Sequence, residues 1–143
     1  MLQTITELTT DIIALIKDDP VRPEIPPQQR VNANSRIYIL KDGDQTQAIT
    51  CVKFLDSVPA DVADLGTIQD VATTAVFYTI WSYASGAGRL LLQQTVASIE
   101  TEFPAITTYV TLSPKTEMAR RFHLNNGARE LRENLHTINY IYK

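Results

Sequence analysis

The sequence predicts an α/β (α+β) fold, in which a mixed, mostly antiparallel central sheet is flanked by helices on both faces. Short β-branched and aromatic runs typical of strands alternate with stretches whose apolar residues recur at helical spacing. An Asp-Gly turn signal joins two of the strand-like runs. The 143 residues, 44% of them hydrophobic, suit a single domain spanning residues 1–143. The expected order is helix, three strands, helix, strand, helix and two strands.

The N-terminal part is expected to form a helix followed by a surface segment. Thr4 and Glu7 have the spacing of a capping box, and apolar residues follow at helical intervals up to the Asp-Asp-Pro stop at residues 18–20. Residues 21–35 are polar and rich in proline, which indicates a surface segment. Pro26 or Pro27 is a suitable first residue for a short helix within it.

Residues 36–40 and 47–55 are expected to be the two arms of a hairpin, joined by the turn at residues 41–44. A longer polar loop follows at residues 57–70. Residues 71–81 then form an apolar run that predicts a buried strand. Cys51 lies within the second arm, where we expect a buried small hydrophobic side chain rather than a reactive one.

The C-terminal third predicts a strand, a helix and a final pair of strands. The strand covers residues 106–112, and Ser113-Pro114 has the composition of a helix start, with Ser113 as its cap. Met118 and Phe122 are expected to face inward. The helix should stop at Asn126-Gly127. The closing strands are expected at residues 128–131 and 135–142.

Composition excludes several classes of function. The net charge is −3 and the sequence has no basic run, which argues against a nucleic-acid or anionic-membrane partner. No window reaches the roughly 20 apolar residues of a membrane span, and the N-terminus lacks the pattern of a signal peptide. We therefore expect a cytoplasmic protein. Two histidines, one cysteine and no clustered carboxylates argue against a metal site.

The stretch from residue 77 to residue 99 is the strongest candidate for a binding site. A buried strand leads through the small-residue turn Ala84–Gly88 into a helix. Gly86 and Gly88 allow close backbone approach, and the free N–H groups of a first helical turn attract an anion. The sequence therefore indicates a phosphate site, with an ordinary tight connection as the alternative.

Two motifs together resemble the GNAT superfamily of acyl-CoA-dependent N-acyltransferases. The first is the strand followed by SGAGRLLL, and the second is ARRFHLNNGA at residues 119–128. The resemblance covers residues 36–143 and implies a GNAT-like acyl-CoA-binding domain. It implies that the edges of the two central strands diverge where the thioester enters.

The resemblance also assigns roles to residues. His123 would be the general acid, where a tyrosine is usual. The cofactor-binding residues would be Ile80, Trp81, Ser82, Ser85, Gly86, Ala87, Gly88, Arg89, Leu90 and Asn126. Besides His123, two further departures weaken the match to acyl transfer. Tyr83 stands where a glutamine or arginine is usual, and the central strand has no glutamate to act as base or to hold a base water.

The second motif also resembles the malonyl-CoA decarboxylase branch of the superfamily. In that branch an L-S-P turn and an F-H-L-x-N-G-A segment hold the catalytic serine and histidine, and here they are Leu112–Pro114 and Phe122–Ala128. The catalytic candidates are therefore Ser113 and His123. We find no match to the large helical domain of that enzyme in these 143 residues. A short chain of this kind also resembles proteins encoded by tailed phages.

Considered without the family, Ser113 is also a plain helix cap and His123 a partly buried structural side chain. On one continuous helix, ten residues would place them roughly 15 Å apart, which disfavours a Ser–His nucleophilic pair. Near the end of a helix, the dipole would favour a charged His123 and burial would oppose it, and the sequence does not decide between them.

Our expectation is an N-acyltransferase that moves an acyl group from acetyl-CoA or another acyl-CoA to an amine. Decarboxylation of a malonyl thioester is the alternative that fits the missing glutamate. A non-catalytic acyl-CoA-binding or phage assembly protein and a scaffold without ligand are the remaining readings. A homodimer stays open.

Overall fold

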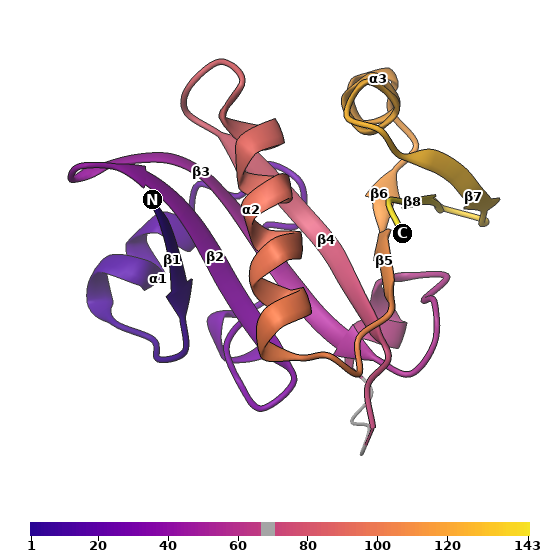
Figure 1. The fold of residues 1–143 in the computed structure, drawn as a ribbon, viewed down its shortest axis with the longest axis horizontal. Coiled ribbons are helices and arrows are strands. Elements are labelled where there is room, and N and C mark those ends of the chain that lie inside the picture. The colour runs from indigo at the N-terminus through magenta and orange to yellow at the C-terminus, as the bar shows by residue number, and fades with distance from the viewer. Residues whose placement is uncertain (67–70) are drawn as a thin grey trace.

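The computed structural model describes residues 1–66 and 71–143 and contains one continuous sheet with helices on both faces (Figure 1). The strands and helices in chain order are β1 Leu2–Ile5, α1 Thr10–Ile16, β2 Ser35–Asp42, β3 Gln45–Leu55, β4 Thr74–Ser82, α2 Ala87–Glu102, β5 Thr108–Thr111, β6 Ser113–Pro114, α3 Glu117–Asn125, β7 Arg129–Glu133 and β8 Thr137–Ile141. Two short 3-10 helices lie at Pro27–Gln29 and Val62–Gly66.

The strands follow the order β1-β2-β3-β4-β5-β8-β6, and β7 pairs with the free side of β8. Within the described residues β4 and β5 are the parallel pair, and every other pairing is antiparallel. The predicted mixed, mostly antiparallel sheet is confirmed.

The two faces of the sheet carry separate apolar layers. Along β2, Ile37 and Ile39 point to the layer that contains α1, whereas Tyr38 and Leu40 point to the layer that contains α2. This is the period-2 alternation of a strand buried on both sides. Buried Leu91 and its neighbours on α2 close the second layer. Cys51 is fully buried in the first layer, as expected.

The N-terminal prediction is wrong in one respect. Residues expected to begin the helix form β1, which pairs with β2, so the capping-box spacing at Thr4 has no helix to cap. The cap of α1 is Thr9, whose hydroxyl accepts a hydrogen bond from the Ile12 amide at 3.2 Å. Pairing with β2 buries Ile5 in the sheet, and this tertiary contact outweighs the local helix signal.

The predicted start of α3 is also wrong. Ser113 lies in β6 and does not cap a helix; the cap is Thr116, whose hydroxyl accepts from the Ala119 amide at 3.2 Å. Met118 is 82% exposed rather than inward, because the short helix presents only part of its surface to the sheet. The stop is confirmed, since Gly127 has a φ of 96° just beyond the helix.

The segment between α1 and β2 is not simply a surface segment. The short helix expected near Pro26 is present at Pro27–Gln29. Arg30, however, is completely buried and forms an ion pair with Asp19. Of the loop expected at residues 57–70, residues 67–70 lie outside the described part.

None of the described helices is long and apolar enough to cross a bilayer.

Candidate functional site

A cavity of about 340 Å³, called here the cleft, opens where β4 separates from β5. The strands pair over Thr74–Phe77 and Thr108–Thr111, and one further bond joins the Leu112 amide to the Phe77 carbonyl at 3.1 Å. Beyond this bond β4 continues to Ser82 beside β3, whereas the segment that follows β5 turns toward β8 and pairs with it as β6. The predicted divergence of the two central strands is confirmed (Figure 1).

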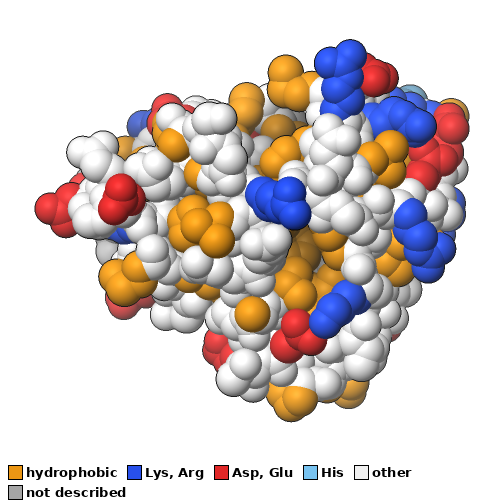
Figure 2. Space-filling view, turned by 45° about the horizontal axis from the view of Figure 1, so that its top comes forward, with side chains coloured by type: hydrophobic (Ala, Val, Ile, Leu, Met, Phe, Trp, Pro, Cys, Tyr) orange, Lys and Arg blue, Asp and Glu red, His pale blue; other side chains and the backbone are white. Residues whose placement is uncertain are grey.

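Six of the predicted site residues line the cleft: Ile80, Trp81, Ser82, Gly88, Ser113 and His123. Four others, Ser85, Gly86, Ala87 and Leu90, line a second cavity of about 430 Å³ next to the β2–β3 hairpin. Arg89 and Asn126 line neither of these two cavities. In the space-filling view, hydrophobic side chains gather in a hollow near the middle of the molecule, with basic side chains beside it (Figure 2).

The free half of β4 supplies backbone to the cleft. From Thr79 to Ser82 the strand is paired on one side, with β3. The other edge faces the cleft, so its N–H and C=O groups are positioned to bond an extended ligand arm. A β-bulge between Cys51 and Val52 in the β3 pairing bends β4 at this point, which helps to separate it from β5.

The glycine turn begins α2. Gly86 is the N-cap and has a φ of 77°, a conformation that favours glycine. No side chain caps the helix, so its first-turn N–H groups have no side-chain acceptor. Gly88 meets a different constraint: a Cβ there would lie 2.9 Å from Cε1 of Phe122 on α3. Close contact between α2 and α3 therefore requires the second glycine.

His123 lies in the wall of the cleft, 97% buried. Its Nδ1 is 2.7 Å from the Tyr142 hydroxyl, and its ring stacks on Tyr140 with centroids 5.1 Å apart. Burial lowers the pKa of His123 to about 4, so the ring is neutral near pH 7. If Tyr142 donates to Nδ1, the single ring proton is on Nε2.

Ser113 lines the same cleft and is 96% buried. Its hydroxyl donates to Thr111 Oγ1 at 2.8 Å. That oxygen also accepts from the Tyr140 amide at 3.0 Å. The Tyr140 amide can only donate, but the hydroxyl hydrogens of Thr111 and Ser113 are free to rotate. In the alternative arrangement Thr111 donates to Ser113, and Ser113 donates into the cleft. Ser113 lies in β6 and His123 in α3, so the distance of roughly 15 Å expected for two residues on one continuous helix does not apply to this pair.

The cleft has a third wall that the sequence did not predict. Pro20 and Val21, which follow α1, line it beside the free half of β4. Asp19 holds this wall in place: one carboxylate oxygen accepts from the Thr79 hydroxyl at 2.7 Å, and the other from Arg30 at 2.7 Å. Both partners of the ion pair have fully buried side chains.

Tyr83 belongs to the same junction. Its hydroxyl donates to Asp18 at 2.8 Å and accepts from the Trp81 indole at 3.0 Å. It therefore joins the end of β4 to the end of α1 instead of taking the place of the usual glutamine or arginine. Asp19 and Arg30 gave no signal in the sequence, because a helix stop and a proline-rich polar segment are the settings where charged residues are normally exposed.

The cleft has no acidic side chain from the described part of the chain. None of the described residues that line it is an aspartate or a glutamate. Within the described residues, no group of His, Cys, Asp and Glu is arranged to hold a metal ion. Among the described lining residues, Ser113 and His123 are polar side chains that lie across the cleft from the free half of β4 and combine a hydroxyl with an imidazole.

Comparison with known families gives one match. The model of the malonyl-CoA decarboxylase C-terminal domain matches residues 47–126, which include β4, the glycine turn, Ser113 and His123. No curated protein sequence matches the chain.

Solved structures show the same fold. The chain is similar to malonyl-CoA decarboxylase from Agrobacterium vitis, with a TM-score of 0.82 and 21% identity over 100% of this chain and 60% of that one. The enzyme from Rhodopseudomonas palustris gives a TM-score of 0.78 and 21% identity over 99% and 59%. This chain thus spans about 60% of the length of these relatives.

GNAT proteins match over nearly their whole length. A putative N-acetyltransferase from E. coli, solved bound to coenzyme A, gives a TM-score of 0.63 and 13% identity over 99% of this chain and 97% of that one. The GNAT-like fold expected from the two motifs is confirmed.

Proposed function

This chain belongs to the family of malonyl-CoA decarboxylase C-terminal domains, and we propose that it releases CO₂ from a malonyl thioester of coenzyme A bound in the cleft. One observation carries the proposal: among the described residues, a serine hydroxyl and a neutral histidine line the same cleft, and no carboxylate does. Decarboxylation needs a group that stabilises an enolate and a group that supplies a proton. It needs no base to deprotonate an amine.

The resemblance and the geometry suggest how the substrate lies. The pantetheine arm would pair with the free edge of β4 at Ile80–Ser82, and the pyrophosphate would meet the backbone of Ser85–Leu90 at the start of α2. This directs the thioester toward Ser113 and His123. Asn126, at the end of α3, is a proposed contact on the resemblance alone.

In the proposed reaction the bond between the carboxylate carbon and the α-carbon breaks. Its electron pair moves into the thioester to form an enolate, and CO₂ leaves. Ser113 would donate a hydrogen bond to the enolate oxygen, where negative charge develops. The Thr111 hydroxyl, 2.8 Å away, would in turn donate to Ser113.

A proton must then reach the α-carbon to give acetyl-CoA. His123 would deliver it from Nε2 while the Tyr142 hydroxyl passes its own proton to Nδ1 across 2.7 Å. The imidazole stays neutral throughout, in agreement with its lowered pKa. The enolate is a far stronger base than the phenolate, so the transfer is favourable. To restore the starting state, a solvent proton would return to Nε2 while Nδ1 gives its proton back to Tyr142, so each turnover consumes one proton.

N-acyl transfer, our expectation from the sequence, is the second candidate. The GNAT-like fold, which extends over the whole chain, supports it. An amine acceptor would have to lose a proton inside the cleft, where no carboxylate is available among the lining residues and the low pKa of His123 makes it a weak base. We therefore place decarboxylation first.

The test compares wild-type protein with His123→Ala, His123→Tyr and the control His136→Ala, which changes an exposed histidine. Each is incubated with malonyl-CoA alone, and with acetyl-CoA and a panel of amines, and products are measured by mass spectrometry. We expect acetyl-CoA and CO₂ from malonyl-CoA, lost in both His123 variants and kept in the control.

Other results lead elsewhere. Acylated amines without CO₂, with activity retained in His123→Tyr, would replace decarboxylation by acyl transfer. Coenzyme A binding without either product would indicate a non-catalytic acyl-CoA-binding or assembly protein. Activity unaffected by both His123 substitutions would remove His123 from the site.

A further inference from the structure

Arg22 is a buried cation behind the wall of the cleft and is not itself one of the residues that line it. It follows Pro20 and Val21, which line the cleft, and is 91% buried. Its Nη2 donates to the carbonyl of Leu112, another lining residue, at 3.0 Å. Its guanidinium therefore lies against the cleft wall rather than in solvent.

The Leu112 carbonyl marks the point where the sheet divides. The amide of the same residue makes the last hydrogen bond between the β5 segment and β4, to Phe77. In a continued parallel ladder the Leu112 carbonyl would accept from a β4 amide two residues further on. Here the Arg22 guanidinium, instead of a β4 amide, donates to the Leu112 carbonyl. The guanidinium thus lies at the apex of the split, where the ladder between the two strands ends.

The positive charge at this apex is not neutralised by its buried neighbours. The Asp19 carboxylate accepts from the Val21 and Arg22 amides, from Thr79 and from the Arg30 guanidinium. Its ion pair is with Arg30, and no side-chain bond joins it to the Arg22 guanidinium. The buried set of two arginines and one aspartate therefore carries a net positive charge.

The Arg22 side chain also has an unused donor. Its Nε is buried and has no hydrogen-bond partner. Burial lowers the pKa of Arg22, opposed by attraction to Glu24 and Asp19, yet an arginine stays protonated at neutral pH. Glu24 is exposed, so solvent weakens its attraction. A buried cation without a counter-ion is costly, and the negative charge of a ligand in the cleft would offset part of that cost.

We propose that Arg22 makes the cleft selective for acyl groups that carry their own carboxylate. The inference rests on the proposed function, because it names the substrate class of that same cleft. A charged acyl end at the apex would meet the net positive charge of the buried set, whereas an acetyl group would leave it unpaired. Arg22 is thus a specificity-determining residue, and the proton transfer does not involve it.

The test measures binding with a matched pair of ligands, malonyl-CoA and its terminal amide. The amide has nearly the same shape, but it has no charge on the acyl group and loses no CO₂. Calorimetry is done in the His123→Ala background, where turnover of malonyl-CoA is suppressed. Because hydrogen bonds to charged groups contribute more than neutral ones, we expect malonyl-CoA to bind about 10- to 100-fold more tightly than the amide.

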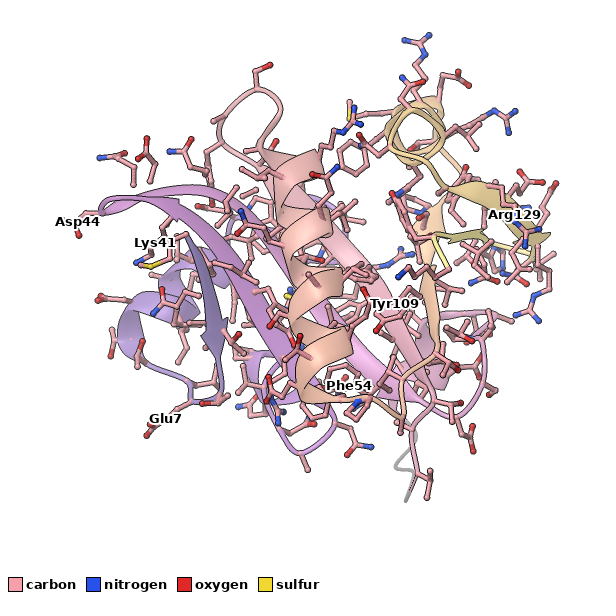
Figure 3. The ribbon with its side chains drawn as sticks, viewed as in Figure 1. Glu7, Lys41, Asp44, Phe54, Tyr109 and Arg129 are labelled. Atoms are coloured by element: carbon pink, nitrogen blue, oxygen red, sulfur yellow. The ribbon has the colours of Figure 1, made fainter. Side chains whose placement is uncertain are left out.

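Substitution of Arg22 should then remove the preference. Arg22→Gln should bring the affinity ratio close to one by weakening malonyl-CoA binding alone, and Arg22→Lys should keep part of the ratio. The control is Arg129→Gln, which changes an exposed arginine on β7 away from the cleft (Figure 3). It should leave the ratio unchanged. Circular dichroism checks the fold of each variant.

If the His123→Ala protein, with Arg22 unchanged, binds malonyl-CoA and its terminal amide equally well, the proposal is overturned. This result does not depend on whether any Arg22 variant folds. A ratio that Arg22→Gln leaves intact in a folded protein would also overturn the proposal. The proposed function fails by a separate readout, namely wild-type protein that releases no CO₂. Selective binding without CO₂ release would keep the role of Arg22 and remove the decarboxylation.

Discussion

Acid should destabilise this protein through His123, and the size of the effect follows from its burial. The ordinary pKa of histidine is 6.5, and in the folded chain burial lowers the pKa of His123 to about 4. Between these values the unfolded state binds a proton that the folded state does not. Stability is therefore fully present above pH 6.5 and is lost as the pH falls toward 4.

The magnitude follows from the difference between the two pKa values. Each pKa unit corresponds to about 1.4 kcal/mol, so His123 should remove about 3 kcal/mol of unfolding free energy across this window. Surface carboxylates also titrate there, so the comparison needs a matched variant. His123→Asn keeps a polar group near the Tyr142 hydroxyl and does not titrate in this range.

Urea unfolding followed by circular dichroism, from pH 8 to pH 4.5, measures the effect. The difference in unfolding free energy between wild type and His123→Asn should shrink by about 1.4 kcal/mol per pH unit below pH 6.5. Parallel pH profiles for the two proteins would refute the reasoning. So would an NMR titration that gives the folded His123 ring an ordinary pKa.

Three further substitutions test contacts of the cleft. Gly88→Ala should cost about 1–3 kcal/mol in thermal unfolding, because its Cβ would lie 2.9 Å from the Phe122 ring, and adding Phe122→Leu should restore part of the loss. Thr111→Val should lower kcat about tenfold with little change in KM, and Thr111→Ser should retain activity, since it keeps the hydroxyl that orients Ser113. Tyr142→Phe should lower CO₂ release by at least about tenfold, because the relay through Nδ1 is lost.

Apolar periodicity was sufficient to predict most of the sheet and α2, because the central strands are buried on both faces and α2 has one continuous buried face. It failed for β1 and β6. The four residues of β1 gain their conformation from pairing with β2, and the two residues of β6 from pairing with β8. Neither strand is long enough to show a pattern of its own, and capping-type residues nearby favoured helices.

The catalytic candidates Ser113 and His123 could be predicted because they lie in short local motifs. The cleft wall formed by the segment after α1 could not be predicted. Asp19 contacts Thr79 and Arg22 contacts Leu112, both of which are distant in sequence, and Arg30 acts through its ion pair with Asp19. Charged residues in a polar, proline-rich segment resemble any exposed loop. Only the fold reveals that this segment crosses the split in the sheet, and so the feature that we propose sets substrate class was invisible in the sequence.

The contact between Gly88 and Phe122 explains why the two motifs belong together. The sequence suggested that Gly88 lets a phosphate approach the backbone, and the structure adds that any Cβ there would push against the Phe122 ring. Phe122 precedes His123 on α3, so displacing its ring would also disturb the histidine, whose ring lies 5.1 Å away, centroid to centroid. The glycine turn and the FHL segment therefore form one structural unit. A change at the helix start should affect the proposed proton donor as well as the proposed binding of coenzyme A.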